Sequence, residues 1–84
     1  MIYKVEVNMA RLTPYLHDQG IALYSKPSAF IFVQADDPDG ACQEALKKIK
    51  NNILTEKDNN TTRDIVNNLN KEARIVKIRS IKHA

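Results

Sequence analysis

From Tyr3 to Met9, apolar side chains alternate with polar ones. Successive side chains of an extended chain point to opposite sides, so this alternation predicts a half-exposed β-strand over residues 2–9. The side expected to face a core comprises Tyr3, Val5, Val7 and Met9. The side expected to face solvent comprises Ile2, Lys4, Glu6 and Asn8.

Residues 29–35, AFIFVQA, form a second extended pattern, which is apolar on both sides. β-Branched and aromatic residues dominate it, as they do in strands. Polar and turn-forming residues border it at 26–28 and 36–38. Continuous apolar runs of this kind are typical of strands buried on both faces, so the pattern predicts a central strand.

An amphipathic helix is predicted directly after this strand, from Pro38 to Leu54. Asp37 is a favourable N-cap residue, and proline suits the first helical position because its missing N–H has no partner there anyway. Acidic residues precede the helix and lysines crowd its end, which complements the helix dipole. One apolar stripe at helical spacing comprises Ala41, Cys42, Ala45, Leu46, Ile49 and Ile53.

The segment 10–28 is compatible with two structures. Thr13 and Pro14 could begin a short helix that Gly20 ends, with a short strand over 21–24 after it. Alternatively, the whole segment forms one long hairpin arm. The sequence leaves both alternatives open.

Beyond the long helix, residues 55–60 (TEKDNN) predict a polar loop, which we expect to be the most mobile part of the chain. Thr61 to Asp64 match the capping-box pattern and predict a second, short helix. Residues 73–82 (ARIVKIRSIK) predict a last strand. Strict alternation along it places Val76 and Ile78 inward, and it places Ile75, Lys77, Arg79 and Ile81 outward.

These elements predict a single α+β domain over residues 1–84. The strands at 29–35 and 73–82 are joined through helices, so we expect them to be parallel, with a right-handed crossover. The N-terminal strand would then lie between them and run antiparallel to both. The expected fold is a small two-layer sandwich, with a three- or four-stranded mixed or antiparallel sheet and two helices on one face.

Composition narrows the class of protein without identifying it. The chain has a formal net charge of +3, one cysteine and no apolar run long enough to span a membrane. A lone cysteine excludes an intrachain disulfide and suits a reducing compartment, so we expect a cytoplasmic protein. A weakly basic balance is compatible with nucleic acid but does not by itself indicate it.

The residues that could carry chemistry are few, and each has a structural explanation. Asp36, Asp37 and Asp39 do not fit a calcium loop, because Ala35 would occupy its first ligand position, whereas helix capping explains them. Cys42 lies on the apolar stripe, which indicates a small core residue. The sequence has no zinc-ligand spacing and no phosphate-binding loop. We therefore expect neither an enzyme nor a metal, a cofactor or a small-molecule substrate.

Part of the chain resembles the third strand and second helix of an RNA recognition motif. The residues that carry the resemblance are 29–35, Asp37, Pro38, Ala45, Leu46 and Ile49, and ARIVKIRSIK is similar to that family's last strand. The resemblance implies that Phe30 and Phe32 stack on unpaired bases. The chain departs from the family's pattern at Ser28, Ile31 and Ala35. The roughly twenty residues between the first two strands are too few for the family's first helix and second strand, so we do not assign the family.

The outward side of the predicted sheet is the candidate binding face. It comprises Ile2, Lys4, Phe30, Phe32, Ile75, Lys77, Arg79 and Ile81. A small apolar patch bordered by charge is typical of a protein interface. The leading hypothesis is therefore a non-catalytic accessory or regulatory protein of a bacterium or phage that binds another protein or forms a homodimer, with no membrane involved.

The alternative hypothesis is binding of RNA or single-stranded DNA by the same face. Phe30 and Phe32 would stack on bases, and Lys4, Lys77 and Arg79 would contact phosphates. The basic side chains of the last strand and the adjacent His83 are equally consistent with a solvated edge strand; they are Arg74, Lys77, Arg79 and Lys82. Glu6, in the middle of the face, counts against nucleic acid.

Overall fold

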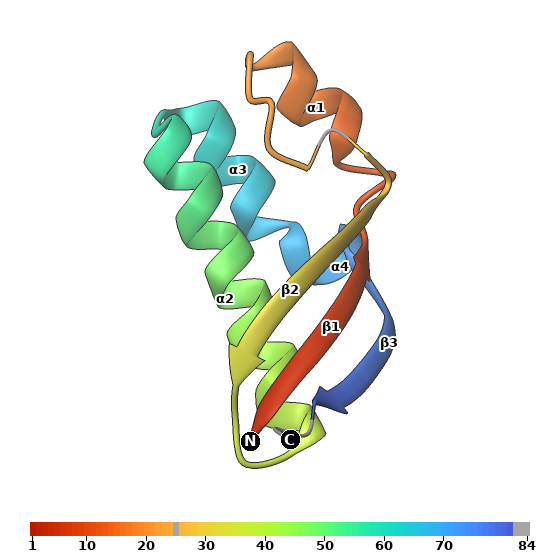
Figure 1. The fold of residues 1–84 in the computed structure, drawn as a ribbon. Coiled ribbons are helices and arrows are strands. Elements are labelled where there is room, and N and C mark those ends of the chain that lie inside the picture. The colour runs from red at the N-terminus through yellow and green to blue at the C-terminus, as the bar shows by residue number, and fades with distance from the viewer. Residues whose placement is uncertain (25, 82–84) are drawn as a thin grey trace.

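The protein is represented by a computed structural model that describes residues 1–24 and 26–81. Ser25, in the segment for which two structures were considered, and Lys82 and His83, at the end of the predicted basic strand, lie outside the described residues. The described chain forms three strands, β1 (Ile2–Asn8), β2 (Ser28–Gln34) and β3 (Arg74–Ile81). Figure 1 shows them as one sheet, with β1 in the middle.

The sheet has the order β2-β1-β3, and β1 is antiparallel to both neighbours. The predicted middle position of the N-terminal strand is thus confirmed, and its inward side is fully buried, as the alternation predicts. The central position predicted for residues 29–35 is wrong, because β2 lies at an edge. Its outward residues are exposed and its inward residues are buried, so it is apolar on both sides without being buried on both.

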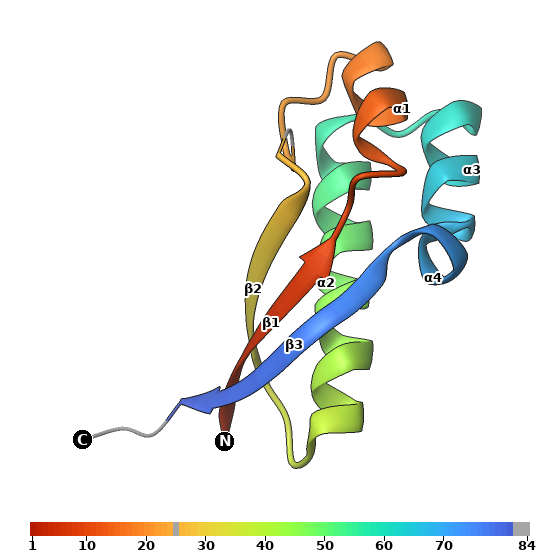
Figure 2. The same ribbon diagram turned by 90° about the vertical axis from the view of Figure 1, so that its right-hand side faces the viewer.

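Four helices complete the fold, α1 (Thr13–Asp18), α2 (Pro38–Glu56), α3 (Asn60–Asn67) and α4 (Leu69–Glu72). Figures 1 and 2 together show α2, α3 and α4 on one side of the sheet and α1 beyond the end of its strands. The expected small α+β fold with helices on one face of an antiparallel sheet is confirmed, with α2 as the main helix. The opposite face of the sheet carries no helix from the described residues.

The N-terminus of α2 forms as its sequence predicts. The Asp37 carboxylate accepts a hydrogen bond from the Gly40 N–H at 2.7 Å, and Pro38 occupies the first turn. Since a carboxylate cap satisfies an N–H that has no helical partner, this start is stable by local interactions alone. The helix continues two residues beyond the predicted end, so the predicted loop 55–60 shrinks to residues 57–59.

The start of α3 differs from the predicted capping box at Thr61. Asn59 is the N-cap, and its side chain accepts a hydrogen bond from the Thr62 N–H while the Thr62 hydroxyl accepts one from the Asn59 N–H, each at 2.8 Å. The short connection is also tied to the end of α1. Lys57 Nζ donates to the Gln19 carbonyl at 2.9 Å, and Asn59 Nδ2 donates to Gln19 Oε1 at 3.2 Å.

Between β1 and β2 the chain adopts the helical alternative. α1 carries Pro14 in its first turn and ends before Gly20, whose φ of 73° suits glycine because the residue has no Cβ. Residues 21–24 form no strand, so that part of the prediction and the hairpin-arm alternative are both wrong. Neither α1 nor the described residues between it and β2 cover the outward side of the sheet (Figure 1).

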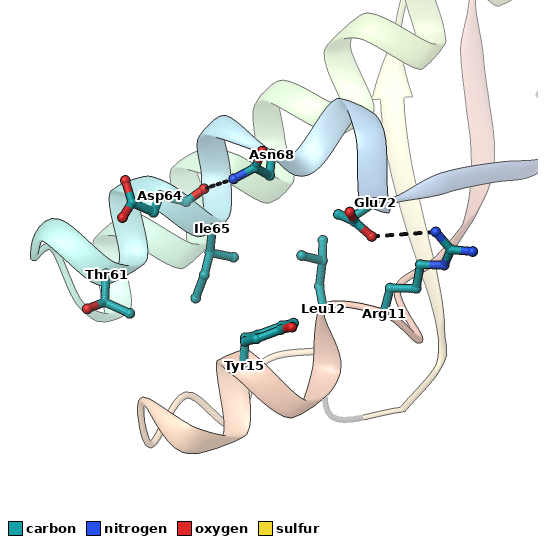
Figure 3. A pocket seen from close by; sticks show the side chains of 8 residues that line it. All are labelled: Arg11, Leu12, Tyr15, Thr61, Asp64, Ile65, Asn68 and Glu72. Atoms are coloured by element: carbon teal, nitrogen blue, oxygen red, sulfur yellow. Dashed lines mark hydrogen bonds and ion pairs between the residues drawn. The ribbon is translucent and has the colours of Figure 1, made fainter.

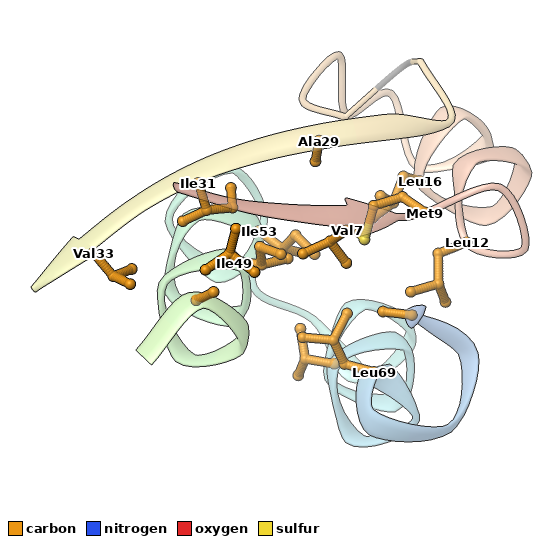
Figure 4. Packing of buried hydrophobic residues seen from close by; sticks show 14 of the residues in the cluster. Val7, Met9, Leu12, Leu16, Ala29, Ile31, Val33, Ile49, Ile53 and Leu69 are labelled. Carbon is orange, nitrogen blue, oxygen red and sulfur yellow. The ribbon is translucent and has the colours of Figure 1, made fainter. Parts of the chain in front are cut away.

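The core fills the space between the sheet and the helices (Figure 4). The buried stripe of α2 comprises Ala41, Ala45, Ile49 and Ile53, while Cys42 and Leu46 of the predicted stripe are half-buried. Val7 of β1 lies beside Ile53 of this stripe, and Val5, Leu16 and Leu69 belong to the same buried cluster. Close packing of these apolar side chains is the main source of stability in a domain of this size.

A β-bulge in β3 changes which of its residues face the core. Glu6 lies opposite Lys77 and Val7 lies opposite Ile75, so Val76 is an extra residue between two regular pairs. Val76 is 55% exposed and Ile75 packs against the core, which reverses the prediction for both residues. From Lys77 onward the strand keeps the predicted orientation, with Ile78 against the core and Arg79 outward.

Candidate functional site

The open face of the sheet is the outward side of β1, β2 and β3, on which side chains lie in cross-strand rows. One row runs from Phe32 through Lys4 to Arg79, and the next runs from Phe30 through Glu6 to Lys77. The pairing of the strands makes side chains from both ends of the chain neighbours, because directly opposite Cβ atoms are about 5 Å apart. The open face therefore places two phenyl rings, three cations and one carboxylate side by side.

Phe30 and Phe32 are the two exposed phenyl rings of the chain. They are 51% and 52% exposed, although the inward residues between and beside them on β2 are buried. Lys4 Nζ lies 4.7 Å from the centre of the Phe30 ring, which is a cation–π contact. No element of the described chain covers either ring, so the arm between β1 and β2 does not explain these aromatic residues (Figure 1).

A shallow hollow of about 110 Å³ lies in the middle of the open face. It is lined by Lys4, Glu6, Phe30, Lys77 and Arg79. Within residues 1–24 and 26–81, no basic side chain comes within 4.0 Å of the Glu6 carboxylate, although three cations surround it. The hollow thus combines an aromatic wall with an acceptor and several donors.

The remaining predicted face residues divide into two groups. Ile2 and Ile81 lie opposite each other at one corner of the open face, and both are half-buried. Ile75 does not belong to the face, because the bulge turns it toward the core. Arg74 lies opposite Asn8 and therefore joins the face, which sequence alternation did not indicate because the bulge shifts the pattern by one residue.

The net positive charge of the chain is concentrated on the open face. The face carries Lys4, Arg74, Lys77 and Arg79 against the single carboxylate of Glu6, a net charge of +3. The whole chain has 13 basic and 10 acidic residues, so the remaining nine basic and nine acidic residues balance. A modest total charge therefore produces a distinctly positive field on one side of the molecule.

The free edge of β2 connects the open face with α2. Lys48 Nζ of α2 donates a hydrogen bond to the Phe32 carbonyl at 3.1 Å, which occupies one acceptor of this edge. Lysines at a sheet edge oppose pairing with the edge of another chain. A hollow of about 450 Å³ continues from Phe32 around this edge, where Lys47 and Lys48 lie beside Glu44.

A second cavity, of about 490 Å³, lies between α1 and the pair α3 and α4 (Figure 3). Leu12 and Ile65 form its apolar floor, and Tyr15 stands at its rim with 61% of the side chain exposed. Arg11 forms an ion pair with Glu72 across one end at 3.8 Å. Arg11 is largely exposed and Glu72 is partly exposed, so this pair contributes little to stability.

The residues considered for chemistry have structural roles. Asp37 caps α2, and no group of three or more metal-ligating residues occurs in the described part of the chain. Burial raises the pKa of the Cys42 thiol, and the nearby Asp39 carboxylate raises it further. Both effects reduce the thiolate fraction, which is the reactive form of cysteine. Cys42 is therefore a poor nucleophile at neutral pH.

The fold and the open face define a class of protein, a small α+β domain with an uncovered, aromatic and basic sheet surface. Comparisons with protein-family profiles, with curated proteins and with solved structures found no match for the chain. Among the residues that the structure places, no helix is long and apolar enough to cross a membrane. The resemblance to an RNA recognition motif is therefore limited to residues 29–38, the apolar positions of α2 and the last strand.

Proposed function

We propose that the protein is a non-catalytic module that binds single-stranded nucleic acid on the open face of its sheet. The observation that carries the proposal is the position of two half-exposed phenyl rings on the face that holds the chain's net positive charge. Aromatic rings stack on bases of any kind, and nearby lysine and arginine side chains pair with phosphates. The register of β3 supports the proposal, because the bulge brings Arg74 to the open face while Ile75 turns toward the core.

The spacing of the two rings favours a single strand over a duplex. Phe30 and Phe32 are two residues apart on one strand, which separates their Cα atoms by roughly 6–7 Å. Bases in a duplex are stacked on one another about 3.4 Å apart along each strand, so they cannot each stack on one of these rings. A single strand can spread two neighbouring bases over the two rings, with the intervening phosphate near Lys4.

Lys4 has two roles in this proposal. In the free protein its ammonium group lies over the Phe30 ring, 4.7 Å from the centre. An exposed cation–π contact contributes only about 0.5–1 kcal/mol, so a stacking base can displace it. The displaced ammonium group then lies beside the backbone of the bound strand, where it pairs with a phosphate.

The test is a titration of the protein against a labelled single-stranded oligonucleotide and against the same sequence in a duplex, followed by fluorescence anisotropy. The proposal predicts salt-sensitive binding of the single strand at micromolar protein and much weaker binding of the duplex. Absence of single-strand binding at low salt contradicts the proposal. Equal or tighter binding of the duplex contradicts the stacking geometry.

Self-association is a second candidate function, favoured by the apolar corner of the open face. Ile2 and Ile81 lie opposite each other there, and Phe32 lies one row away on β2. Sedimentation equilibrium tests this directly, because a dimer formed through the corner dissociates in a Phe32→Ala variant. Since both functions use the same surface, an added oligonucleotide also converts such a dimer to monomer. A dimer that survives both changes uses another surface.

A further inference from the structure

We infer that Glu6 makes the open face prefer bases with N–H donors on their Watson–Crick edge, and guanine above the others. This inference deepens the proposed function and rests on it. The observation behind it is a carboxylate that lies in the hollow of the open face without an ion-pair partner within 4.0 Å among the described residues. Nothing in the packing of the sheet requires an acidic residue at this position.

A purely structural explanation of Glu6 would be a cross-strand ion pair. Glu6 lies directly opposite Lys77 on β3, and opposite charges in this position stabilise a sheet. The two groups do not form that pair in the described structure, since only Arg11–Glu72 and Arg63–Asp58 reach ion-pair distance there. The carboxylate oxygens therefore remain available to a ligand.

The position of Glu6 relative to Phe30 determines what it can contact. The two residues are directly opposite each other in the β1–β2 ladder, so their Cβ atoms are about 5 Å apart. A base stacked on the Phe30 ring extends beyond the ring's edge, because a base with its attached sugar is larger than a phenyl group. Its hydrogen-bonding edge then lies over the hollow, beside the Glu6 carboxylate and between Lys77 and Arg79.

Carboxylate chemistry selects among the four bases at this position. An ionised carboxylate only accepts hydrogen bonds, and it accepts two parallel ones well. Guanine presents two adjacent donors, the N1–H and the N2 amino group. Cytosine and adenine present one exocyclic amino group each, and the carboxylate contact with the cytosine N4 amino group is a known pairing in nucleic-acid readout. Uracil presents a single N–H between two carbonyl oxygens that the carboxylate repels.

The experiment uses a short uridine tract, the same tract with one central guanosine, and the tract with a central inosine. Inosine keeps the N1–H of guanosine and lacks the N2 amino group. Wild-type protein is expected to bind the guanosine tract about tenfold more tightly than the uridine tract, with inosine between them. Anisotropy titrations at one low salt concentration measure all three affinities.

Two variants distinguish base recognition by Glu6 from the general effect of removing a negative charge. Glu6→Gln is expected to bind the uridine tract more tightly than wild type, because a negative charge leaves the face, and to lose most of the preference for guanosine. Glu56→Gln removes an exposed carboxylate at the far end of α2 and is expected to keep the full preference.

The outcomes distinguish failure of base selection by Glu6 from failure of the proposed function. If no tract binds, the proposed function fails and the inference fails with it. If the tracts bind with equal affinity, or if the guanosine preference survives in Glu6→Gln, the inference alone is overturned. A loss of preference in Glu6→Gln with retained preference in Glu56→Gln supports it.

Discussion

Phe30 and Phe32 leave half of each side chain exposed, at positions where polar residues would complete an amphipathic strand. A phenyl group gains free energy from burial in proportion to the area removed from water, about 25 cal/mol per Å². Exposed rings forgo much of that gain, and two of them side by side form an apolar patch that a free monomer does not need. Under the proposed function, a ligand covers both rings.

The variant Phe32→Ala tests whether an exposed ring of the open face contributes to binding. We expect single-strand affinity to fall about tenfold, because stacking on one aromatic ring contributes 1–3 kcal/mol per base. We expect stability to change by less than about 1 kcal/mol, because the ring is half exposed. Anisotropy and urea unfolding measure the two effects.

Tyr15→Ala is the matched control for this substitution. Tyr15 is also a largely exposed aromatic residue, but it lies on α1 at the rim of the other cavity. Its replacement is expected to leave affinity unchanged. Equal losses in the two variants would mean that the open face has no special role.

At the scale of elements, α2 is the part of the fold that local sequence determines most completely. Its cap, its first proline and its apolar stripe are all set within the helix itself, so its start was predicted to the residue. The bulge in β3 could not be predicted, because it depends on which residues of β1 lie opposite, and that pairing joins the two ends of the chain. The edge position of β2 was missed for another reason.

Residues 29–35 suggested a central strand because Phe30 and Phe32 make its outward side apolar. These two residues caused the wrong prediction of a central strand, and they lie at the centre of the candidate site. Local rules are most often broken at functional positions, where a side chain is kept for a ligand and not for the fold. The same argument applies to Glu6. In the sequence its negative charge is an argument against nucleic-acid binding, but in the structure it lies opposite Phe30.

Replacement of the α2 cap tests the contribution of a local element to the whole domain. Asp37→Ala removes the acceptor of the Gly40 N–H and is expected to lower the free energy of unfolding by about 1 kcal/mol. Asp37→Asn keeps an acceptor at a preferred cap residue and is expected to lower it by much less. Urea unfolding monitored by circular dichroism measures both. A loss of equal size in the two variants would contradict the cap's role.

Two single-residue deletions test the bulge. Deletion of Val76 leaves Lys77 opposite Glu6 and Ile75 opposite Val7, so the strand becomes regular without a change of register. Deletion of Lys77 also gives a regular strand, but it places Val76 opposite Glu6 on the open face. We expect both proteins to fold and only the second to lose single-strand affinity.

The measurements for this pair are thermal unfolding and anisotropy. A cooperative unfolding transition in both variants confirms that β3 has one residue more than regular pairing with β1 requires. If deletion of Val76 unfolds the protein or weakens binding as much as deletion of Lys77, the assignment of Val76 as the extra residue is wrong.

For the whole molecule, the distribution of charge is more informative than its total. The open face carries a net +3 while the rest of the chain is balanced, so a polyanion meets a favourable field from one side only. Helices and sheet together bury one core, and no helix within residues 1–24 and 26–81 lies on the opposite face of the sheet (Figure 2). The fold therefore holds the four basic residues and the two phenyl rings on one face of the sheet.

Salt dependence measures how many of these charges meet phosphates. Contacts with three to four phosphates predict a plot of log affinity against log salt with a slope of about −2 to −3 for a single strand. The double variant Lys77→Gln/Arg79→Gln is expected to make that slope shallower by about 1.4, because two contacts are lost. Lys50→Gln/Lys71→Gln, which removes two exposed charges from α2 and α4, is expected to leave it unchanged. Equal changes in both would indicate attraction by net charge alone.

The most direct test of the central claim is an NMR titration of labelled protein with a short single-stranded oligonucleotide. The largest amide shifts are expected on the open face of the sheet, at Lys4, Glu6, Phe30, Phe32, Lys77 and Arg79. Little change is expected in α2 and around Tyr15. Shifts concentrated on the helices or in the cavity beside α1, or no shifts at all, would contradict binding on the open face.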